Sequence, residues 1–348
     1  MKTSRKSSGL VLLFLLALAG FAGGVSAATI YVDQAYGPGG DGSQEMPFDT
    51  IQAAINSGAG ETIIVYPGTY NENINVTANL KVIGYDGPYT TRIVGSLPPG
   101  DHDVVTLAES IIVTIQGFNI SGGRYGIYEP QDTTLYLKNC VVCANLSHGL
   151  NIVNTNAKPP HATVVNNVFA NNTGSGIAFV AYDGIASDTY PPFLTALNNI
   201  FFANSAYGIQ DSILNAISSY KERIVLDYND TSGNSLGGYS PNFGTGKTYP
   251  TGIHSITLPP EFVGGTGPSA GKDFRLRPTS PCRDTGNPAI AYLDPDGTVN
   301  DVGAYGGPGA QRFYTNPNDG PIVREVTIDK GLIPKGETFT IRAKGAVR

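Results

Sequence analysis

The sequence predicts an all-β solenoid, and three observations carry this prediction. A twelve-residue segment recurs four times, apolar residues alternate inside each copy, and 44 glycines and 24 prolines among 348 residues mark frequent turns. Charged residues make up only 14% of the chain, below the roughly 25% of an average soluble domain. This composition is a poor match to helical bundles, coiled coils and basic nucleic-acid-binding domains.

The amino-terminal segment predicts export. Basic residues at Lys2, Arg5 and Lys6 precede an apolar run from Leu10 to Ala19, and small residues follow up to Ala27. This is the order of a secretory signal peptide. The alternative is an uncleaved anchor, but about ten apolar residues are too few to span a bilayer. We therefore expect a signal peptide over residues 1–27 and a secreted or cell-surface protein with no later transmembrane span.

A short helix is expected before the first coil. Asp49 can serve as its N-cap, Ile51, Ala54 and Ile55 form one apolar face, and Gly58 fits its end. A solenoid exposes its apolar interior at its ends and needs a cap there. We therefore expect this helix to cover the open core, followed by strands at residues 62–66, 80–83 and 104–107.

The four repeats are the main signal. They begin at Gln116, Asn139, Asn166 and Asn198 and read QGFNISGGRYGI, NCVVCANLSHGL, NNVFANNTGSGI and NNIFFANSAYGI. Their shared glycines, Gly126, Gly149, Gly176 and Gly208, are spaced by 23, 27 and 32 residues. This spacing is close to one coil of a solenoid, and the growing excess predicts longer loops after each glycine.

Alternation within the repeats predicts which side chains are buried. We expect the interior to hold the columns Phe118 and Ile120, Val141 and Cys143, Val168 and Ala170, and Ile200 and Phe202. Val142, Phe169 and Phe201 are then expected outside, under the carboxy-terminal segment. Two asparagine columns, 139/166/198 and 145/172/204, predict hydrogen-bonded ladders at the bends.

The three cysteines are too few for a disulfide framework. Cys140 and Cys143 form a C-x-x-C motif, but they fall three residues apart in an expected strand. Because side chains alternate along a strand, the two thiols should lie on opposite faces. A mutual disulfide or a shared zinc ion is therefore disfavoured.

Segments at both ends resemble a known superfamily. YVDQAYGPGGDGS, PFDTIQAAIN and TIIVYPGTYNENI look like the opening of right-handed parallel β-helix proteins of the pectate-lyase-like superfamily. LDYNDTSGN, KDFRLRPTSPCRDTGNP and DPDGTVNDVGAYGG are similar to the closing segment of exported bacterial β-helix proteins. The resemblance implies a right-handed parallel β-helix, which we expect to occupy residues 28–310.

Residues 311–348 differ from the rest of the chain. They contain a linker-like stretch and two alternating patterns around Pro334-Lys335-Gly336, which resemble the first hairpin of an immunoglobulin-like surface module. Two strands cannot form such a domain alone. The sequence leaves two alternatives open, a fragment of a longer chain or a hairpin that packs back on the β-helix.

The resemblance also implies where a ligand would bind, because many superfamily members bind or cleave polysaccharides on one outer sheet. The analogous outward positions are Tyr128, Asn151, Ala178 and Gln210. Before the glycines lie Arg124, Tyr125, His148, Ser175 and Tyr207, and loop 180–192 carries Tyr182, Asp183, Asp188 and Tyr190. We expect Tyr125, Tyr128, Asn151, Tyr182 and Tyr207 to bind substrate.

Catalytic roles are assigned by chemistry. A lyase needs a cation to neutralise a uronate and a base, for which Arg124 and His148 or Tyr125 are suited. A hydrolase needs two carboxylates, and Asp183 with Asp188 or Glu129 could supply them. The predicted catalytic set is Arg124, His148 and Asp183. Ser147-His148-Gly149 and Asp101-His102-Asp103 are similar to motifs of polygalacturonases and alginate epimerases, but neither motif is complete.

The carboxylates of Asp294, Asp296 and Asp301 lie close together around a glycine turn and could hold a structural calcium ion. Turn chemistry alone also explains this pattern. No other cofactor is expected. The net charge of −6 disfavours nucleic acid as a partner. The expected partner is a polysaccharide or cell-surface glycan, and the rival function is a non-catalytic surface or adhesion module of a larger exported protein.

Overall fold

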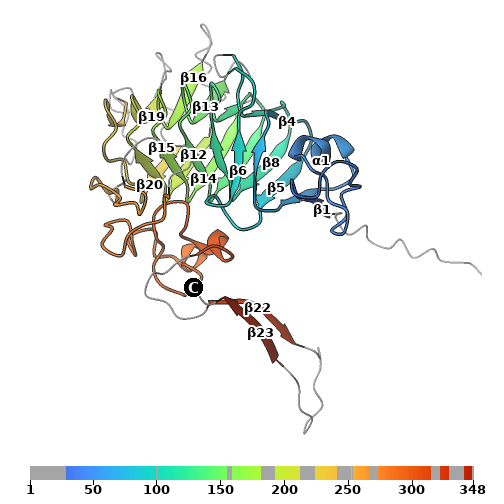
Figure 1. Ribbon diagram of the computed structural model, residues 1–348. Helices are drawn as coiled ribbons and strands as arrows, with labels where there is room; N and C mark the ends of the chain where they lie inside the picture. The colour runs from blue at the N-terminus through green and yellow to red at the C-terminus, as the bar shows by residue number, and fades with distance from the viewer. Residues whose placement is uncertain are drawn as a thin grey trace, which may run out of the picture.

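The computed structural model describes residues 29–98, 101–154, 159–181, 193–211, 224–240, 252, 254–265, 273–314, 322–328 and 341–346 (Figure 1). The predicted signal peptide lies outside the described residues. No helix within this part of the chain is long and apolar enough to cross a membrane.

Three sheets, all with parallel pairing, form the body of the molecule. Sheet A holds β1 (Thr29–Val32), β2 (Thr62–Val65), β5 (Leu80–Gly84), β8 (Ile112–Gln116), β11 (Thr134–Lys138), β14 (His161–Val165), β17 (Phe193–Leu197) and β20 (Ile224–Asp227). Sheet B holds β3 (Gly68–Asn71), β6 (Thr91–Val94), β9 (Asn119–Ser121), β12 (Val141–Cys143), β15 (Val168–Ala170) and β18 (Ile200–Phe202). Sheet C holds β4 (Ile74–Val76), β7 (Val105–Leu107), β10 (Ile127–Glu129), β13 (Leu150–Asn154), β16 (Ile177–Ala181), β19 (Tyr207–Asp211) and β21 (Gly237–Tyr239).

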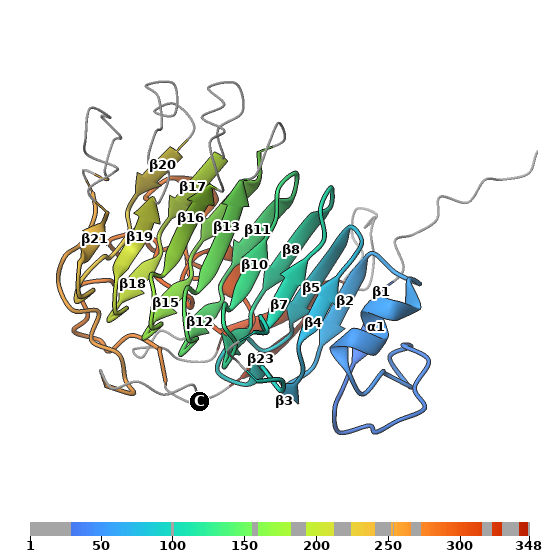
Figure 2. The ribbon, with the colours of Figure 1, turned by 90° about the horizontal axis from the view of Figure 1, so that it is seen from above.

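Each coil contributes one strand to each sheet in turn, so the fold is a parallel β-helix, as the sequence predicts (Figure 2). The interior is built from columns of apolar side chains in register. On sheet A one such column runs through Ile63, Val82, Ile115, Leu137, Val164, Ala196 and Leu226, all buried. A single coil cannot bury these side chains, and stacking buries them between neighbours.

Helix α1 (Ile51–Ser57) lies at the β1 end of the solenoid (Figure 2). Its apolar residues Ile51, Ala54 and Ile55 are buried in the core, as the sequence predicts. The N-cap is Thr50, one residue after the predicted Asp49, because the Thr50 hydroxyl accepts the N–H of Ala53 at 3.2 Å. The helix ends at Gly58, as predicted, and this C-cap residue is left-handed, with φ of 59°.

The bend between sheets B and C carries the predicted asparagine ladder. The Nδ2 groups of Asn145, Asn172 and Asn204 donate to the Oδ1 atoms of Asn172, Asn204 and Asn234 at 3.0, 3.0 and 2.8 Å. A second ladder, at the bend between sheets A and B, joins Asn167, Asn199 and Asn229 at 3.0 Å per step. It lies one residue after the predicted column Asn139, Asn166 and Asn198.

The predicted facing was right for Phe118 and Ile120, which lie in the interior, and wrong for β12, β15 and β18. Val142, Phe169 and Phe201 lie in the interior, with Phe169 and Phe201 stacked at 5.1 Å. The outward side chains are Val141, Cys143, Val168, Ala170, Ile200 and Phe202. The reason lies at the bend, where Asn139 has a φ of 50°. This left-handed residue interrupts the alternation, so every later side chain of the strand changes face.

Residues 256–265 and 273–314 cover the outward face of sheet B. Phe262, Phe274, Val302, Tyr305 and Phe313 are buried there with the outward sheet B side chains. The predicted cover is therefore present, but it packs on Val141, Val168 and Ile200 and not on Val142, Phe169 and Phe201. Cys140 belongs to the interior and Cys143 to the covered outer face, so the prediction of opposite faces is confirmed.

Asn139 and Asn166, from the column that the sequence predicts to form a ladder, bond to the covering segment. Asn139 Nδ2 donates to the carbonyls of Ala304 and Gly306, at 3.1 and 2.8 Å. Asn166 Nδ2 donates to Asp301 O at 3.0 Å. The covering segment includes η3 (Ile290–Tyr292) and η4 (Pro308–Ala310). Further along the chain, β22 (Ile322–Ile328) and β23 (Ile341–Ala346) pair antiparallel, as predicted, and their connecting turn lies outside the described residues.

Candidate functional site

The outer face of sheet C carries the four strand positions that the sequence predicts to face a ligand. Thr106, Tyr128, Asn151, Ala178 and Gln210 stand in register on successive strands from β7 to β19. Their neighbours along each strand, such as Ile127 and Leu150, lie in the interior. The row therefore faces outward, as predicted, with one side chain per coil.

Three aromatic rings gather beside this row, at the bend that leads into sheet C. Tyr125 stacks on Tyr128 at a centroid distance of 6.4 Å and 19°, and on His148 at 5.7 Å and 10°. The Arg124 guanidinium lies 4.6 Å from the centroid of the Tyr125 ring. We call Arg124, Tyr125, Tyr128 and His148 the Tyr125 cluster. All four were predicted site residues, and the solenoid brings them together.

Asp103, from the preceding coil, pairs with Arg124. Its two carboxylate oxygens accept from Nε and Nη2 of Arg124 at 3.0 and 3.1 Å, and one also accepts the Tyr125 N–H at 3.3 Å. These charge-assisted bonds raise the pKa of Arg124. Asp103 is buried and Arg124 is partly exposed. The positive charge of Arg124 is thus already compensated within the protein.

His148 is held in one tautomer. Its Nδ1 atom accepts the backbone N–H of Ser175 at 3.0 Å, so the neutral ring carries its proton on Nε2. Burial lowers the pKa of His148 to about 4. At neutral pH the ring is therefore an uncharged hydrogen-bond donor through Nε2–H.

The next coil continues this polar network. Ser175 Oγ donates to Gln210 Oε1 at 2.7 Å and accepts the N–H of Tyr207 at 3.2 Å. Gln210 belongs to the outward row of sheet C. Tyr207, a predicted binding residue, therefore adjoins the site through its backbone.

Asn151 is the most enclosed polar residue of the row. Only 1% of its surface is exposed, and its Oδ1 atom has no hydrogen-bond partner. It stands in register between Tyr128 and Ala178 on the outer face. A buried acceptor that lacks a donor is unusual in folded proteins, and Thr91, Ser121 and Asn198 carry unpaired buried polar atoms elsewhere in the described part of the fold.

Glu129 faces the other way. It follows Tyr128 on β10, is fully buried, and neither carboxyl oxygen has a hydrogen-bond partner. Burial raises its pKa well above the ordinary value of 4.5, so the folded state favours the protonated form. Glu129 cannot act on a ligand at the outer face, and its prediction as one of two hydrolase carboxylates was wrong.

The loop predicted to wall the site lies outside the described residues. Tyr182, Asp183, Asp188 and Tyr190 belong to it. The predicted catalytic role of Asp183 and the predicted binding role of Tyr182 therefore stay predictions.

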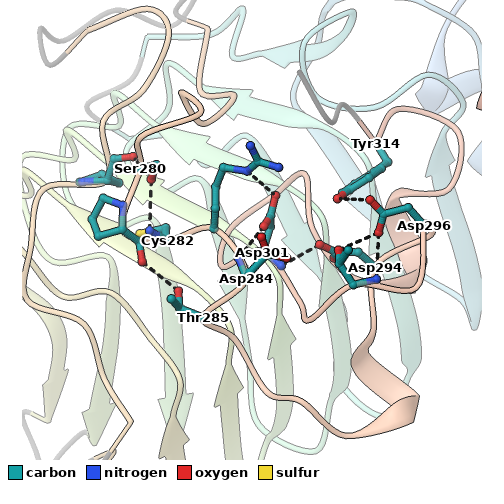
Figure 3. Close-up of polar contacts among 12 residues, drawn as sticks. Ser280, Cys282, Asp284, Thr285, Asp294, Asp296, Asp301 and Tyr314 are labelled. Atoms are coloured by element: carbon teal, nitrogen blue, oxygen red, sulfur yellow. Dashed lines mark hydrogen bonds and ion pairs between the residues drawn. The ribbon is translucent and has the colours of Figure 1, made fainter. Parts of the chain in front are cut away.

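The three aspartates predicted to hold calcium lie in the segment that covers sheet B (Figure 3). Asp294 accepts the N–H groups of Asp301 and Gly307, and Asp301 accepts the N–H of Asp284 at 2.8 Å. Asp296 accepts the Tyr314 hydroxyl at 3.1 Å. Within the described part of the chain no group of three acidic, histidine or cysteine side chains could hold a metal ion. Calcium binding stays a prediction.

Sequence reasoning missed two polar pairs. Asp103 and Arg124 are 21 residues apart, about one coil, so the repeat spacing could have indicated their contact. Asp227 Oδ2 lies 2.9 Å from His254 Nδ1, and the His254 ring stacks on Tyr228 at 4.4 Å. His254 follows the last sheet A strand, beyond the repeats, and no sequence signal places it there.

Comparisons with known proteins give a family and two distant structural likenesses. A search of the curated proteins found no match. Among solved structures, a pectate lyase, Pel9A, is similar at 14% identity and a TM-score of 0.36, over 81% of this chain and 97% of that one. A pectin methylesterase mutant in complex with a hexasaccharide is similar at 13% identity and a TM-score of 0.35, over 60% and 80% of the two chains. The model of the family described as "Protein of unknown function (DUF1565)" matches residues 37–272, and the chain belongs to this family.

Proposed function

We propose that the protein binds a polysaccharide along the outer face of sheet C. The single observation that carries this proposal is the Tyr125 cluster, three stacked and partly exposed rings beside a row of uncharged outward side chains. Aromatic faces stack on the apolar faces of sugar rings, and flanking polar groups bond to hydroxyls. The predicted signal peptide would place this binding outside the cell.

The geometry of the face suits an extended chain. The row presents one side chain per coil, and neighbouring parallel strands lie about 4.8 Å apart. An oligosaccharide that lies along the solenoid axis can therefore contact the partly exposed side chains of Tyr125, Tyr128 and Gln210, while Asn151 and Ala178 lie buried between them. Because successive contacts add up, weak stacking at each ring yields useful affinity for a polymer.

The contacts of Arg124 and His148 favour binding over catalysis. Two nitrogens of Arg124 are bonded to Asp103, and Nδ1 of His148 is bonded to Ser175. The lowered pKa of His148 makes it a poor proton acceptor. We therefore assign both residues to ligand binding, and a catalytic role would fall to residues outside the described part, such as Asp183.

Binding of the folded protein to a panel of neutral and acidic polysaccharides, measured by calorimetry, tests the proposal. Tyr125→Ala should weaken binding by at least about tenfold, the loss of one aromatic stacking contact. Tyr136→Ala is the matched control, because Tyr136 lies on the outer face of sheet A with Lys138 Nζ 5.8 Å from its ring. Absence of binding to every polymer, with the fold verified by circular dichroism, would refute the proposal.

A further inference from the structure

We infer that the glycan taken by the outer face of sheet C is uncharged where it contacts the Tyr125 cluster, a hydroxyl-rich neutral polymer and not a polyuronate. This inference rests on the proposed function and names its ligand class. It is carried by the pairing of Arg124, the orphan acceptor of Asn151 and the uncharged row between them.

The cation of the cluster is not available to a carboxylate. The guanidinium of Arg124 holds Asp103 through two bonds and lies against the Tyr125 ring. The nearby His102 contacts the carbonyl of Pro98 through Nδ1 at 3.2 Å. A sugar carboxylate at this position would compete with Asp103, a buried carboxylate that is already in place.

The row itself offers no charge. Thr106, Tyr128, Asn151, Ala178 and Gln210 are all uncharged. The ring of His148 is also uncharged near neutral pH, and its Nε2–H can donate to a hydroxyl or ring oxygen. A uronate brought to this face would lose hydration without gaining a counter-charge from these residues.

Asn151 requires a donor. Its Oδ1 atom is buried and has no hydrogen-bond partner in the protein. A sugar hydroxyl can donate to this oxygen, whereas an ionised carboxylate has only acceptors and would repel it. Asn151 therefore favours a hydroxyl at this position, which neutral sugars and uronates both carry, and the discrimination of charge rests on the pairing of Arg124 and on the uncharged row.

Two forms of one polymer that differ in the charge of their sugars test the inference. Homogalacturonan is compared with its fully methyl-esterified form, which differs in charge at each sugar, alongside a neutral glucan and a neutral galactan. Affinity is measured at pH 7 with a chelator, so that no cation bridges protein and uronate. We expect the uncharged polymers to bind at least about tenfold more tightly than the de-esterified one. Equal or tighter binding of the de-esterified polymer overturns the inference and leaves the proposed function intact.

Asp103→Asn sharpens the test, because it removes the charge that compensates Arg124. We expect this variant to gain affinity for the de-esterified polymer by about tenfold. Asp227→Asn is the control, since it changes the net charge equally at the end of β20, on sheet A. If the folded Asp103→Asn variant gains no more than Asp227→Asn, the inference is overturned. Absence of binding to all polymers refutes the proposed function, and the inference falls with it.

Discussion

The outer faces of sheets B and C arise from the same coils, yet the chain covers one and leaves the other partly open. On sheet B the outward side chains are apolar, among them Val141, Val168 and Ile200, and residues 256–265 and 273–314 bury them. On sheet C Ala178 is the one aliphatic member of the five-residue outward row, and Tyr125, Tyr128 and Gln210 stay partly exposed. Because the backbone is equivalent in the two sheets, side-chain chemistry decides which face is covered and which can take a ligand.

The largest effect should come from opening the covered face. Phe262 is buried and makes edge contacts with Phe202 and Phe274, at 5.9 and 5.1 Å. Phe262→Ala should lower the free energy of unfolding by about 4 kcal/mol, because it leaves a cavity between the cover and sheet B. Urea unfolding measures the change. The matched variant on the open side, Tyr125→Ala, should cost less than about 1 kcal/mol; similar losses would erase the distinction between the two faces.

A smaller loss is expected at the bend between the two sheets. Asn172 lies in the middle of the ladder, donating to Asn204 and accepting from Asn145. Asn172→Ala removes the oxygen that accepts from the Asn145 N–H and Nδ2 groups and the donor to the Val142 carbonyl, at a cost of about 3 kcal/mol. Asn171, one residue earlier, has a φ of 56°, so Asn171→Gly should change stability by less than about 1 kcal/mol. Thermal unfolding of the pair checks the contrast, and equal losses would show that the ladder adds nothing.

The interior behind the open face holds a group that should destabilise the fold. Because the pKa of Glu129 is raised by burial, the folded state favours the protonated form. The stability that Glu129 gains from this raised pKa is fully present below about pH 4.5 and is lost as the pH rises toward the pKa of the folded state. Glu129→Leu should therefore raise stability at pH 7, by about 2 kcal/mol. Urea unfolding at pH 4 and 7 tests this, and a variant less stable than the wild type at pH 7 contradicts it.

The last effect is local and concerns the cover of sheet B. Burial raises the pKa of Asp294 from 3.8 to about 7 and that of Asp301 from 3.8 to about 6. The stability that both carboxyl groups lend to the cover is full below about pH 4 and falls as pH rises to about 7. Amide exchange at residues 301–307, corrected for the intrinsic pH dependence, should become faster over this range, and Asp294→Asn should weaken the trend. Amide exchange at these residues that becomes slower as the pH rises would contradict the prediction.

The difference between the faces also shows how far the sequence predicts the structure. Shared glycines such as Gly149 and Gly176 align the coils, because their backbones approach neighbouring coils too closely for a side chain. The ladder asparagines mark the bends for a similar local reason. The facing of sheet B could not be predicted from alternation, because left-handed residues such as Asn139 shift the pattern by one. The gapless alignment of the repeats is also off by one residue between the first copy and the second, because Asn119 and not Phe118 pairs with Val141.

The candidate site was predictable in position and only partly in chemistry. Tyr125, Tyr128 and His148 fall next to the shared glycines, so the repeat alone places them together. The charge state of the site depends on contacts between coils, which no local pattern reveals. Asp103 compensates Arg124 from one coil earlier, and Ser175 fixes the His148 tautomer from one coil later. These contacts pair the Arg124 cation with a carboxylate and fix the His148 tautomer, so the pattern that resembles a lyase site holds neither a free cation nor a ready base.

Hydrogen–deuterium exchange with and without a neutral oligosaccharide tests the ligand face most directly. Binding at sheet C should slow exchange at residues 123–129 and 147–152, which carry the Tyr125 cluster and Asn151. Residues 134–138 and 161–165, on the outer side of sheet A, should not change. Slowed exchange confined to sheet A, with residues 123–129 unaffected, would contradict the assignment of the glycan to sheet C.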